Sequence, residues 1–248
     1  HYNDLAQVFR PSHADYTTFA KFGIKASSGG GRASARETIG RVAAAAVAEQ
    51  ILATLSPETK VVGYVQSVKD KSLQVQDPEK LTRHQVEQNI LRCPDQKAYP
   101  ALEEVITTAQ KKGDSVGGTI GCVLQNVPAG LGDPVFDKFE ADLAKAMMSL
   151  PASKGFEVGM GFAATELYGS EHNDPFTMAA GKVRTTSNRS GGIQGGITNG
   201  ELIYFRVAFK PVATIFKEQD TVNSKGENVR MKPKAGRHDP CVLPRAVP

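Results

Sequence analysis

The sequence contains no tryptophan, and aromatic residues make up only 7% of the chain. So few aromatic side chains disfavour the stacking platforms on which proteins bind the bases of single-stranded nucleic acids. The formal net charge is +4, which is too small for the strongly basic surface of a nucleic-acid-binding domain. We therefore expect no nucleic-acid partner.

Cysteine is also scarce, since only Cys93, Cys122 and Cys241 occur and they lie far apart. An odd number of widely spaced cysteines forms no disulfide framework and is typical of a reducing compartment. The five histidines include no His-x-x-x-His pair, and no cysteine has the spacing of a zinc ligand. The sequence therefore predicts neither a disulfide nor a metal site.

Long hydrophobic runs are missing as well. No uninterrupted apolar run reaches the ~18 residues that suggest a membrane span, so we expect no membrane partner. The 248 residues are enough for one large domain or two small ones. Because the chain begins at His1 without methionine and stops at Pro248 without a tail, we expect residues 1–248 to form a single domain that is incomplete at both ends.

The most informative stretch that is present is a glycine run that opens into an alanine-rich helix, residues 29–55. Ser34 and Glu37 have the spacing of a capping box, which predicts an N-cap at Ser34 and a first helical turn directly after it. A helix N-terminus favours anions, and three arginines within ten residues add positive charge beside it. An anion site and a solvated surface helix both remain open interpretations.

The body of this helix predicts a buried position. Residues 42–48 are seven consecutive apolar residues, mostly alanine. A helix that is apolar all round is enclosed on most sides, and alanine permits close approach of neighbouring elements. Ser56-Pro57 should end the helix. We expect it to be central to the core, with its N-terminus at a cleft.

Arg10 and His13 lie in a turn-like segment shortly before the glycine run. Histidine titrates near neutral pH and can therefore act as an acid or a base. A single loop histidine is more often an ordinary polar residue, and the sequence alone leaves both interpretations open.

The remaining pattern predicts further helices and strands. Strands are expected at 60–68, 115–127, 156–164 and 201–209, and helices at 82–92, 100–112 and 136–150. Phe136 should begin the apolar stripe of the last helix. Residues 169–191 read as an irregular surface loop. Asn199-Gly200 indicates a hairpin that joins a glycine-rich strand to 201–209, and a second hairpin is expected around 223–226.

Two glycine patterns need interpretation. Residues 159–164 match G-x-G-x-x-A, but no helical pattern follows, so a dinucleotide site is not predicted. The paired glycines of residues 191–196 indicate that something approaches the backbone closely. A ligand and tight packing against the alanine helix are both compatible with them.

Taken together, six stretches resemble motifs of the chorismate synthase family, occur in family order and cover nearly the whole chain. They are RPSHADY (10–16), GGGRASARETIGRVAAAAVAE (29–49), GSEHNDPF (169–176), SGGIQGGITNGE (190–201), RVAFKP (206–211) and GRHDPCVLPRAVP (236–248). No single motif is diagnostic, but six in sequence make an accidental match very improbable.

The resemblance implies a fold, a reaction and a cofactor. The fold would be α+β, with a central helical layer between antiparallel β-sheets. The reaction would be the anti-1,4-elimination of phosphate from 5-enolpyruvylshikimate 3-phosphate to give chorismate, the last step of the shikimate pathway. Reduced FMN would be required although there is no net redox change, and NADPH is a candidate reductant. A homotetramer in the cytoplasm, or in a plastid, is implied as well.

The resemblance also implies roles for individual residues. His13 would protonate the reduced flavin, and Asp239 would assist proton removal near it. Substrate contacts would come from Arg10, Ser34, Arg36 and Arg237. Flavin contacts would come from Arg32, Ala33, Ser34, Pro151, Ala152, Gly195, Lys210, Pro211, Val212, Ala213, Thr214 and Arg237. Guanidinium groups suit a departing phosphate and carboxylates because they donate bidentate hydrogen bonds.

The chain departs from the family pattern in several places. Ala33 replaces a common serine, and Val212-Ala213 replaces more hydroxylic residues. The N-terminal Gly-Glu-Ser-His-Gly segment, whose histidine is the proposed acid for the phosphate, is absent, as is the helix after the final Arg-Ala-Val-Pro. The six motifs make a lyase the first hypothesis. The missing histidine motivates the alternative, a truncated, non-catalytic fragment that binds flavin or a phosphoanion. An unrelated flavin oxidoreductase would need a hydride donor site, which the sequence does not contain.

Overall fold

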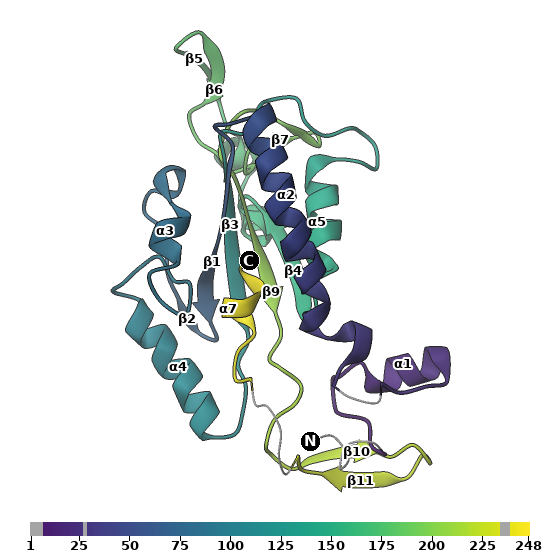
Figure 1. Ribbon diagram of the computed structural model, residues 1–248. Helices are drawn as coiled ribbons and strands as arrows, with labels where there is room; N and C mark the ends of the chain where they lie inside the picture. The colour runs from purple at the N-terminus through teal and green to yellow at the C-terminus, as the bar shows by residue number, and fades with distance from the viewer. Residues whose placement is uncertain (1–6, 27–28, 234–238) are drawn as a thin grey trace.

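The computed structural model describes residues 7–26, 29–233 and 239–248. Its centre is a five-stranded sheet with the strand order β2-β1-β3-β9-β4, in which every neighbouring pair is antiparallel (Figure 1). The strands are β1 (Lys60–Val68), β2 (Lys71–Ser72), β3 (Gly118–Gln125), β4 (Ser153–Val158) and β9 (Ile203–Phe209). In β9 every second residue, from Ile203 to Phe209, is buried and Arg206 is exposed, as expected for a strand with one face in the core.

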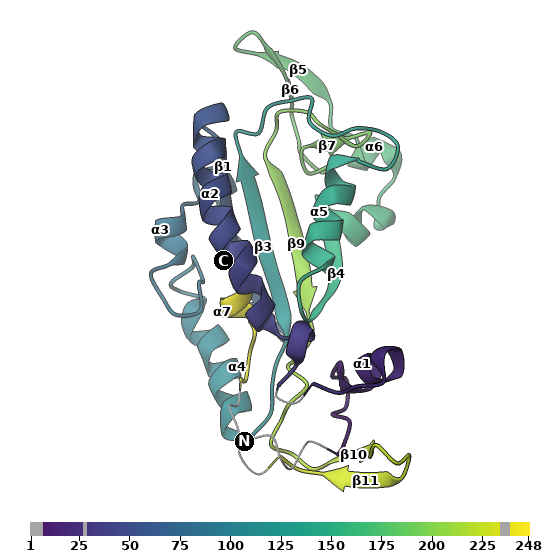
Figure 2. The ribbon, with the colours of Figure 1, turned by 45° about the vertical axis from the view of Figure 1, so that its right-hand side comes forward.

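Helices cover this sheet. Figure 2 shows α2 (Ile39–Leu55) and α5 (Phe139–Met148) running along one side of it. α5 packs on β4 through Phe139, Leu143 and Met147. α3 (Arg83–Val86) and α4 (Tyr99–Lys111) pack at the β1–β2 edge, where Val86 and Leu102 are buried.

Short elements make up the rest of the described residues. Three two-stranded hairpins are β5 (Phe176–Ala179) with β6 (Lys182–Thr185), β7 (Ile193–Gln194) with β8 (Ile197–Thr198), and β10 (Gln219–Val222) with β11 (Asn228–Met231). Short helices are α1 (Asp15–Phe22), α6 (Gly169–His172) and α7 (Leu243–Ala246), with 3₁₀ turns at η2 (Gly31–Ala33), η3 (Ala35–Thr38), η4 (Pro78–Lys80) and η5 (Gly161–Glu166). The α+β class with antiparallel sheets is confirmed. The described residues supply one large sheet and the helical layer beside it.

The helix after the glycine run starts differently from the prediction. The α-helix begins at Ile39, and residues Ala35–Thr38 form a 3₁₀ turn. Ser34 caps this turn by accepting a hydrogen bond from the Arg36 backbone. The capping box is not formed, because the Glu37 carboxylate accepts a hydrogen bond from Arg32 at 2.9 Å. A charged guanidinium forms a stronger hydrogen bond with a carboxylate than a neutral backbone N–H does, so Glu37 pairs with Arg32.

The burial expected for this helix is wrong for the described chain. No residue of α2 is buried, and Ile39 and Leu55 are 76% and 78% exposed. The alanines are apolar all round, but neighbouring elements in this chain approach α2 on one side only. By length and composition alone the helical stretch Ala35–Leu55 could cross a membrane, which is weak evidence because core helices of soluble proteins pass the same test.

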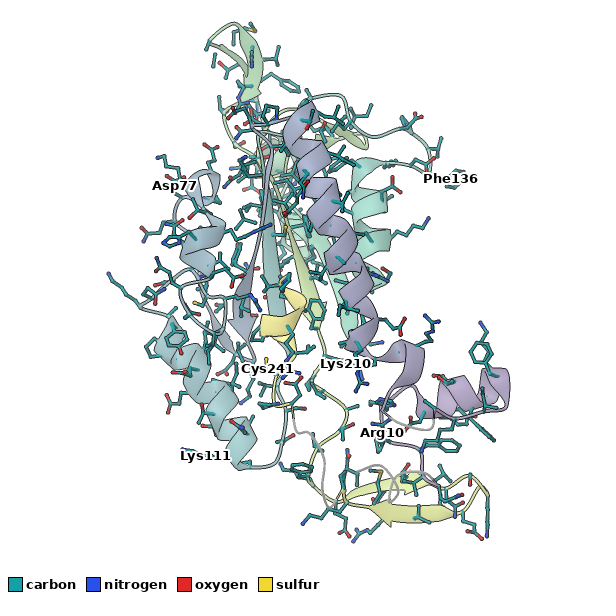
Figure 3. The ribbon with its side chains drawn as sticks, in the orientation of Figure 1. Arg10, Asp77, Lys111, Phe136, Lys210 and Cys241 are labelled. Carbon is teal, nitrogen blue, oxygen red and sulfur yellow. The ribbon has the colours of Figure 1, made fainter. Side chains whose placement is uncertain are left out.

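Other helix and strand ends also differ. α5 starts at Phe139, and Phe136 is 88% exposed before it, so Phe136 is not part of the apolar stripe (Figure 3). β4 ends at Val158, since Gly159 turns the chain at a φ of +60° toward η5. α3 is a single turn, capped by Thr82 and Gln85, in place of a helix over 82–92. α4 and the β10–β11 hairpin match their predictions to within one or two residues.

The glycine-rich stretch turns at a different place. The hairpin bends at Gly195-Gly196, both at positive φ, and Asn199-Gly200 only leads into β9. β9 pairs with β3 and β4, not with the glycine-rich strands. A Cβ on Gly196 would lie 2.4 Å from the Lys138 side chain, so packing explains this glycine, although the contact is not with the alanine helix. The loop expected at 169–191 contains α6 and the β5–β6 hairpin.

Candidate functional site

Four segments meet where β9 ends, on the side of α1 (Figure 3). They are residues 10–15, 29–41, 149–153 and 210–214. The Arg10 guanidinium donates hydrogen bonds to the Gly29 carbonyl at 2.8 Å and to the Thr214 hydroxyl at 3.2 Å. The Lys210 backbone N–H donates to the Ala152 carbonyl at 3.0 Å. Segments that are up to 204 residues apart in sequence are thus joined directly.

This end of the sheet carries a group of cations that we call the basal cluster: Arg10, Lys25, Arg41, Lys154 and Lys210. Arg41 reaches from α2 to Ser149 at the end of α5, with a 2.7 Å hydrogen bond to its hydroxyl. Burial lowers the pKa of Lys210, and the nearby Lys154 ammonium lowers it further. Positive groups held close enough to destabilise one another favour an anionic ligand.

Arg10 is held rigidly. It is 6% exposed, and its Nε and Nη2 donate to the two carboxylate oxygens of Asp15 at 2.8 and 2.9 Å. Its Nη1 donates to Thr214. Within the described part of the chain, one hydrogen of Nη1 has no protein acceptor, so a single N–H of this group is left for a ligand.

His13 lies beside the same carboxylate. Its Nδ1 is 3.0 Å from Asp15 Oδ1, but the geometry is not that of an aligned hydrogen bond. Its Nε2 faces the glycine run: a Cβ on Gly30 would lie 3.4 Å from Nε2 and 3.3 Å from the Ser34 backbone. The imidazole therefore presents Nε2 to the start of η2.

Two residues other than glycine adopt left-handed backbone conformations here. Ser12 has a φ of +57° and Ala152 a φ of +71°. Lys210 binds both, because its Nζ donates to the Ser12 carbonyl at 2.5 Å and its backbone N–H donates to Ala152. Such conformations cost about 1–3 kcal/mol each and are concentrated at active and ligand-binding sites.

Asp239 lies on a neighbouring segment. The carbonyl of Pro240, the next residue, accepts a hydrogen bond from the backbone of Val116, and Ser115 donates to the Val212 carbonyl. The Asp239 carboxylate is 22% exposed and pairs with Arg245 of α7 at 2.6 Å. The segment is therefore adjacent to 210–214, while the carboxylate itself is engaged with Arg245. Arg237 lies outside the described residues.

The other sequence-predicted residues lie at the rim or farther away. The Arg32 side chain is 94% exposed and pairs with Glu37, and Arg36 is exposed as well. Ala33 and Ser34 are in the same turn, and Pro151, Pro211 and Ala213 are in the joined segments. Gly195 does not lie near these segments. The carbonyl of its neighbour Gly196 accepts a hydrogen bond from the Phe139 backbone at the start of α5, while Ala152 follows the end of α5. A helix of ten residues separates the two by about 15 Å.

Two hollows lie elsewhere. An apolar groove of about 790 Å³ runs between α2 and β1 and includes Val247 and Pro248. A second hollow, of about 560 Å³, contains Asp77, Glu79 and Glu201. Carboxylates repel a phosphorylated acid, so the basal cluster is the better site for an anion.

Among the described residues no group of histidine, cysteine, aspartate and glutamate side chains could hold a metal ion.

Comparison with known proteins decides the family. The sequence model described as chorismate synthase matches residues 1–248. The chain belongs to the chorismate synthase family. The chorismate synthase of Prochlorococcus marinus (strain MIT 9301) is 60% identical over 249 residues, which cover 100% of this chain and 67% of that protein. The chorismate synthase of Synechococcus elongatus (strain ATCC 33912 / PCC 7942 / FACHB-805) is 58% identical over 248 residues, covering 100% and 68%.

A solved chorismate synthase has the same fold. The structure titled "Crystal Structure of Chorismate Synthase" superposes with a TM-score of 0.66 at 32% identity, covering 80% of this chain and 63% of that chain. The chain thus spans about two thirds of the length of its curated relatives. Membership of the chorismate synthase family makes it a carbon–oxygen lyase chain that acts on phosphates, in the shikimate pathway of aromatic amino acid biosynthesis.

Sequence reasoning missed three charged residues of this site: Asp15, Lys25 and Lys154. Asp15 stands inside the RPSHADY stretch, five residues after Arg10 and two after His13, so one motif already contained the whole ion-pair group. Nothing in the sequence around Lys25 or Lys154 indicates that they approach this carboxylate or Lys210, because both contacts depend on the folding of distant segments.

Proposed function

We propose that the basal cluster binds 5-enolpyruvylshikimate 3-phosphate and reduced FMN for the elimination of phosphate. The observation that carries the proposal is the meeting of five cationic side chains and the His13 imidazole at one end of the sheet. A substrate with a phosphate and two carboxylates requires convergent donors, and stabilising the departing phosphate is usually a large part of such catalysis. The acidic hollow at Glu201 has the opposite character.

Substrate binding is assigned to Arg10, Ser34, Arg36 and Arg237. Arg10 is fixed before the ligand arrives, which spares the entropy cost of ordering a long side chain. Arg36 is exposed beside the same turn, and it has no ion pair with another described residue that would have to break before it binds an anion. Arg41 keeps this turn near the end of α5 through its hydrogen bond to Ser149.

The donor set of the neighbouring turns fits a flavin. Backbone carbonyls and amides of segments 151–152 and 210–214 lie beside Arg10, and cations are available for a phosphate tail. The residues assigned to FMN are Arg32, Ala33, Ser34, Pro151, Ala152, Lys210, Pro211, Val212, Ala213, Thr214 and Arg237. Gly195 is left out of this set, because it lies about 15 Å away at the other end of α5. Reduced FMN, when bound, supplies transient electron density to the substrate, and NADPH is the candidate reductant.

Proton handling is assigned to His13 and Asp239. His13 presents Nε2 toward the glycine run and can hold a proton there while Asp15 faces its Nδ1. Asp239 can accept a proton once its carboxylate is freed from Arg245, a pairing at the partly exposed surface that costs little to break. The proposal includes a homotetramer, and a location in the cytoplasm or in a plastid.

An anaerobic assay of phosphate release tests this function. The intact protein is mixed with reduced FMN and 5-enolpyruvylshikimate 3-phosphate, and Lys210→Met is compared with Lys182→Met, which removes an exposed lysine of the β5–β6 hairpin. We expect release by the wild type and by Lys182→Met and a loss of tenfold or more in kcat/KM for Lys210→Met. Binding of both ligands without phosphate release would refute the proposal in favour of a non-catalytic binding protein.

A further inference from the structure

Asp15, the first residue of α1, is a buried carboxylate surrounded by cationic groups. It is 3% exposed. It accepts hydrogen bonds from the Arg10 backbone, Nε and Nη2, and lies 3.0 Å from His13 Nδ1 and 3.9 Å from Lys25 Nζ. One carboxylate therefore connects the anion-binding arginine and the histidine of the proposed mechanism.

The charge of this carboxylate is maintained by its neighbours. Burial alone would raise the pKa of Asp15, but the contacts with His13 and Arg10 outweigh burial and hold the pKa well below its usual range. A buried ion pair of this kind often contributes little to stability compared with apolar packing. Stability alone therefore does not explain this buried ion pair, and the geometry supports a role in orienting Arg10 and His13.

The effect on His13 follows from the two ring nitrogens. Nδ1 is buried, and apart from Asp15 it has no partner among the described residues. Nε2 is the nitrogen that faces Gly30 and the start of η2. A carboxylate beside Nδ1 favours the proton on that nitrogen, which leaves Nε2 free to exchange a proton with a ligand. The side chain is 19% exposed, so a ligand can reach it.

We propose that Asp15 is a positioning residue, which fixes the tautomer and direction of His13 and, through the same carboxylate, the direction of Arg10. This inference rests on the proposed function, because the proton that His13 Nε2 exchanges belongs to that reaction. At 3% exposure, Asp15 itself has almost no surface that a substrate or cofactor could touch. A purely structural role, in which Asp15 only neutralises buried Arg10, is the alternative that the test must separate.

The test uses the intact protein in three variants. Asp15→Asn removes the charge and can present an amide N–H to the ring, and Asp15→Glu keeps the charge on a longer side chain. Asp174→Asn is the matched control, since Asp174 is also buried, at 8% exposure, and accepts hydrogen bonds from Ser187 and two backbone amides. Histidine-selective ¹⁵N labelling reports the His13 tautomer by long-range ¹H–¹⁵N NMR, with His13→Gln to assign the signal.

We expect the wild type and Asp174→Asn to carry the neutral-ring proton on Nδ1, and Asp15→Asn to shift it toward Nε2. In phosphate release, Asp15→Asn should lower kcat by about 100-fold, within the range of general acid–base catalysis, and should also raise KM, because Arg10 loses the carboxylate that fixes its direction. Asp15→Glu should recover part of kcat. If Asp15→Asn does not fold, Asp15→Glu decides: a kcat lowered fivefold or more with wild-type stability supports the proposal.

An unchanged tautomer in Asp15→Asn, or a changed tautomer with wild-type kcat, would overturn it. A wild-type kcat for Asp15→Glu would do so when Asp15→Asn cannot be studied. Absence of phosphate release by the wild type would refute the proposed function instead, and the NMR signal would still show whether Asp15 sets the His13 tautomer.

Discussion

Replacing Arg10 by lysine is a sharp test of how the site is held. The guanidinium donates four side-chain hydrogen bonds: two to Asp15, one to the Gly29 carbonyl and one to the Thr214 hydroxyl. A lysine ammonium keeps the charge but is a single point on a flexible chain, so it can replace one of these bonds, or at most two. The Asp15 carboxylate keeps a cation nearby but loses its paired donors.

The magnitude follows from the lost bonds. Two to three hydrogen bonds are lost, each contributing on the order of 1 kcal/mol, and more where the carboxylate is the acceptor. We expect the free energy of unfolding to fall by about 2–4 kcal/mol, which is a large part of the 5–15 kcal/mol that is typical of a native protein. With a urea m-value of about 2–3 kcal/mol/M, the unfolding midpoint should fall by roughly 1 M.

The assay is urea unfolding of the intact protein at neutral pH, followed by circular dichroism. Arg36→Lys is the matched control, because Arg36 is exposed and donates no side-chain hydrogen bond among the described residues. Its free energy of unfolding should stay within about 0.5 kcal/mol of the wild-type value. If Arg10→Lys is as stable as Arg36→Lys, the guanidinium does not hold Asp15, Gly29 and Thr214 together and the reasoning fails.

Further predictions concern the surroundings of the site. In urea unfolding, Gly117→Ala should destabilise the protein by about 1–3 kcal/mol, because a Cβ there would lie 2.9 Å from the Pro211 backbone and closer to the Phe209 carbonyl. The same variant should bind anions more weakly. Gly40→Ala, in an open helical position, should stabilise the protein by about 0.5–1 kcal/mol in the same urea assay. Burial raises the pKa of Asp174, but hydrogen bonds from the following loop hold it well below its usual range. Its stabilisation is therefore present above about pH 4 and lost as the pH falls, so acid titrations should show a flatter dependence in Asp174→Asn. Asp239→Asn should cut turnover severely with flavin binding mostly retained, and full activity in stopped-flow assays would remove Asp239 from the mechanism.

Local sequence patterns predicted several of the strands and helices. The alternation in residues 201–209 and the apolar spacing of α5 are short-range signals of a strand and a helix, and both elements form. The positions of Arg10 and His13 beside the glycine run were also predictable, because a short connection limits how far apart they can lie. The hydrogen bond from Arg10 to Gly29 shows this directly.

The errors have physical causes that sequence patterns do not reveal. The spacing of Ser34 and Glu37 indicated a capping box, but Arg32 offers the Glu37 carboxylate a charged donor. A turn at Ala180-Gly181, both at positive φ, closes a hairpin that the polar composition of residues 169–191 concealed. Alanine content indicated a buried helix, yet burial depends on which elements approach α2, and composition does not specify that.

Long-range electrostatics were the least predictable part of the site. Lys154 and Lys210 are 56 residues apart, the difference between their residue numbers, and meet only because β4 and β9 are paired in the sheet. Asp15 was visible in its motif, but its burial, and with it its influence on His13, depends on the segments that pack around α1.

The most direct test is a crystal structure of the intact protein with oxidised FMN and 5-enolpyruvylshikimate 3-phosphate. We predict that a substrate oxygen lies within hydrogen-bond distance of Arg10 Nη1, with the flavin ring beside residues 210–214. Ligands bound instead in the hollow beside Glu201, with nothing within reach of Arg10, would contradict the assignment of the basal cluster.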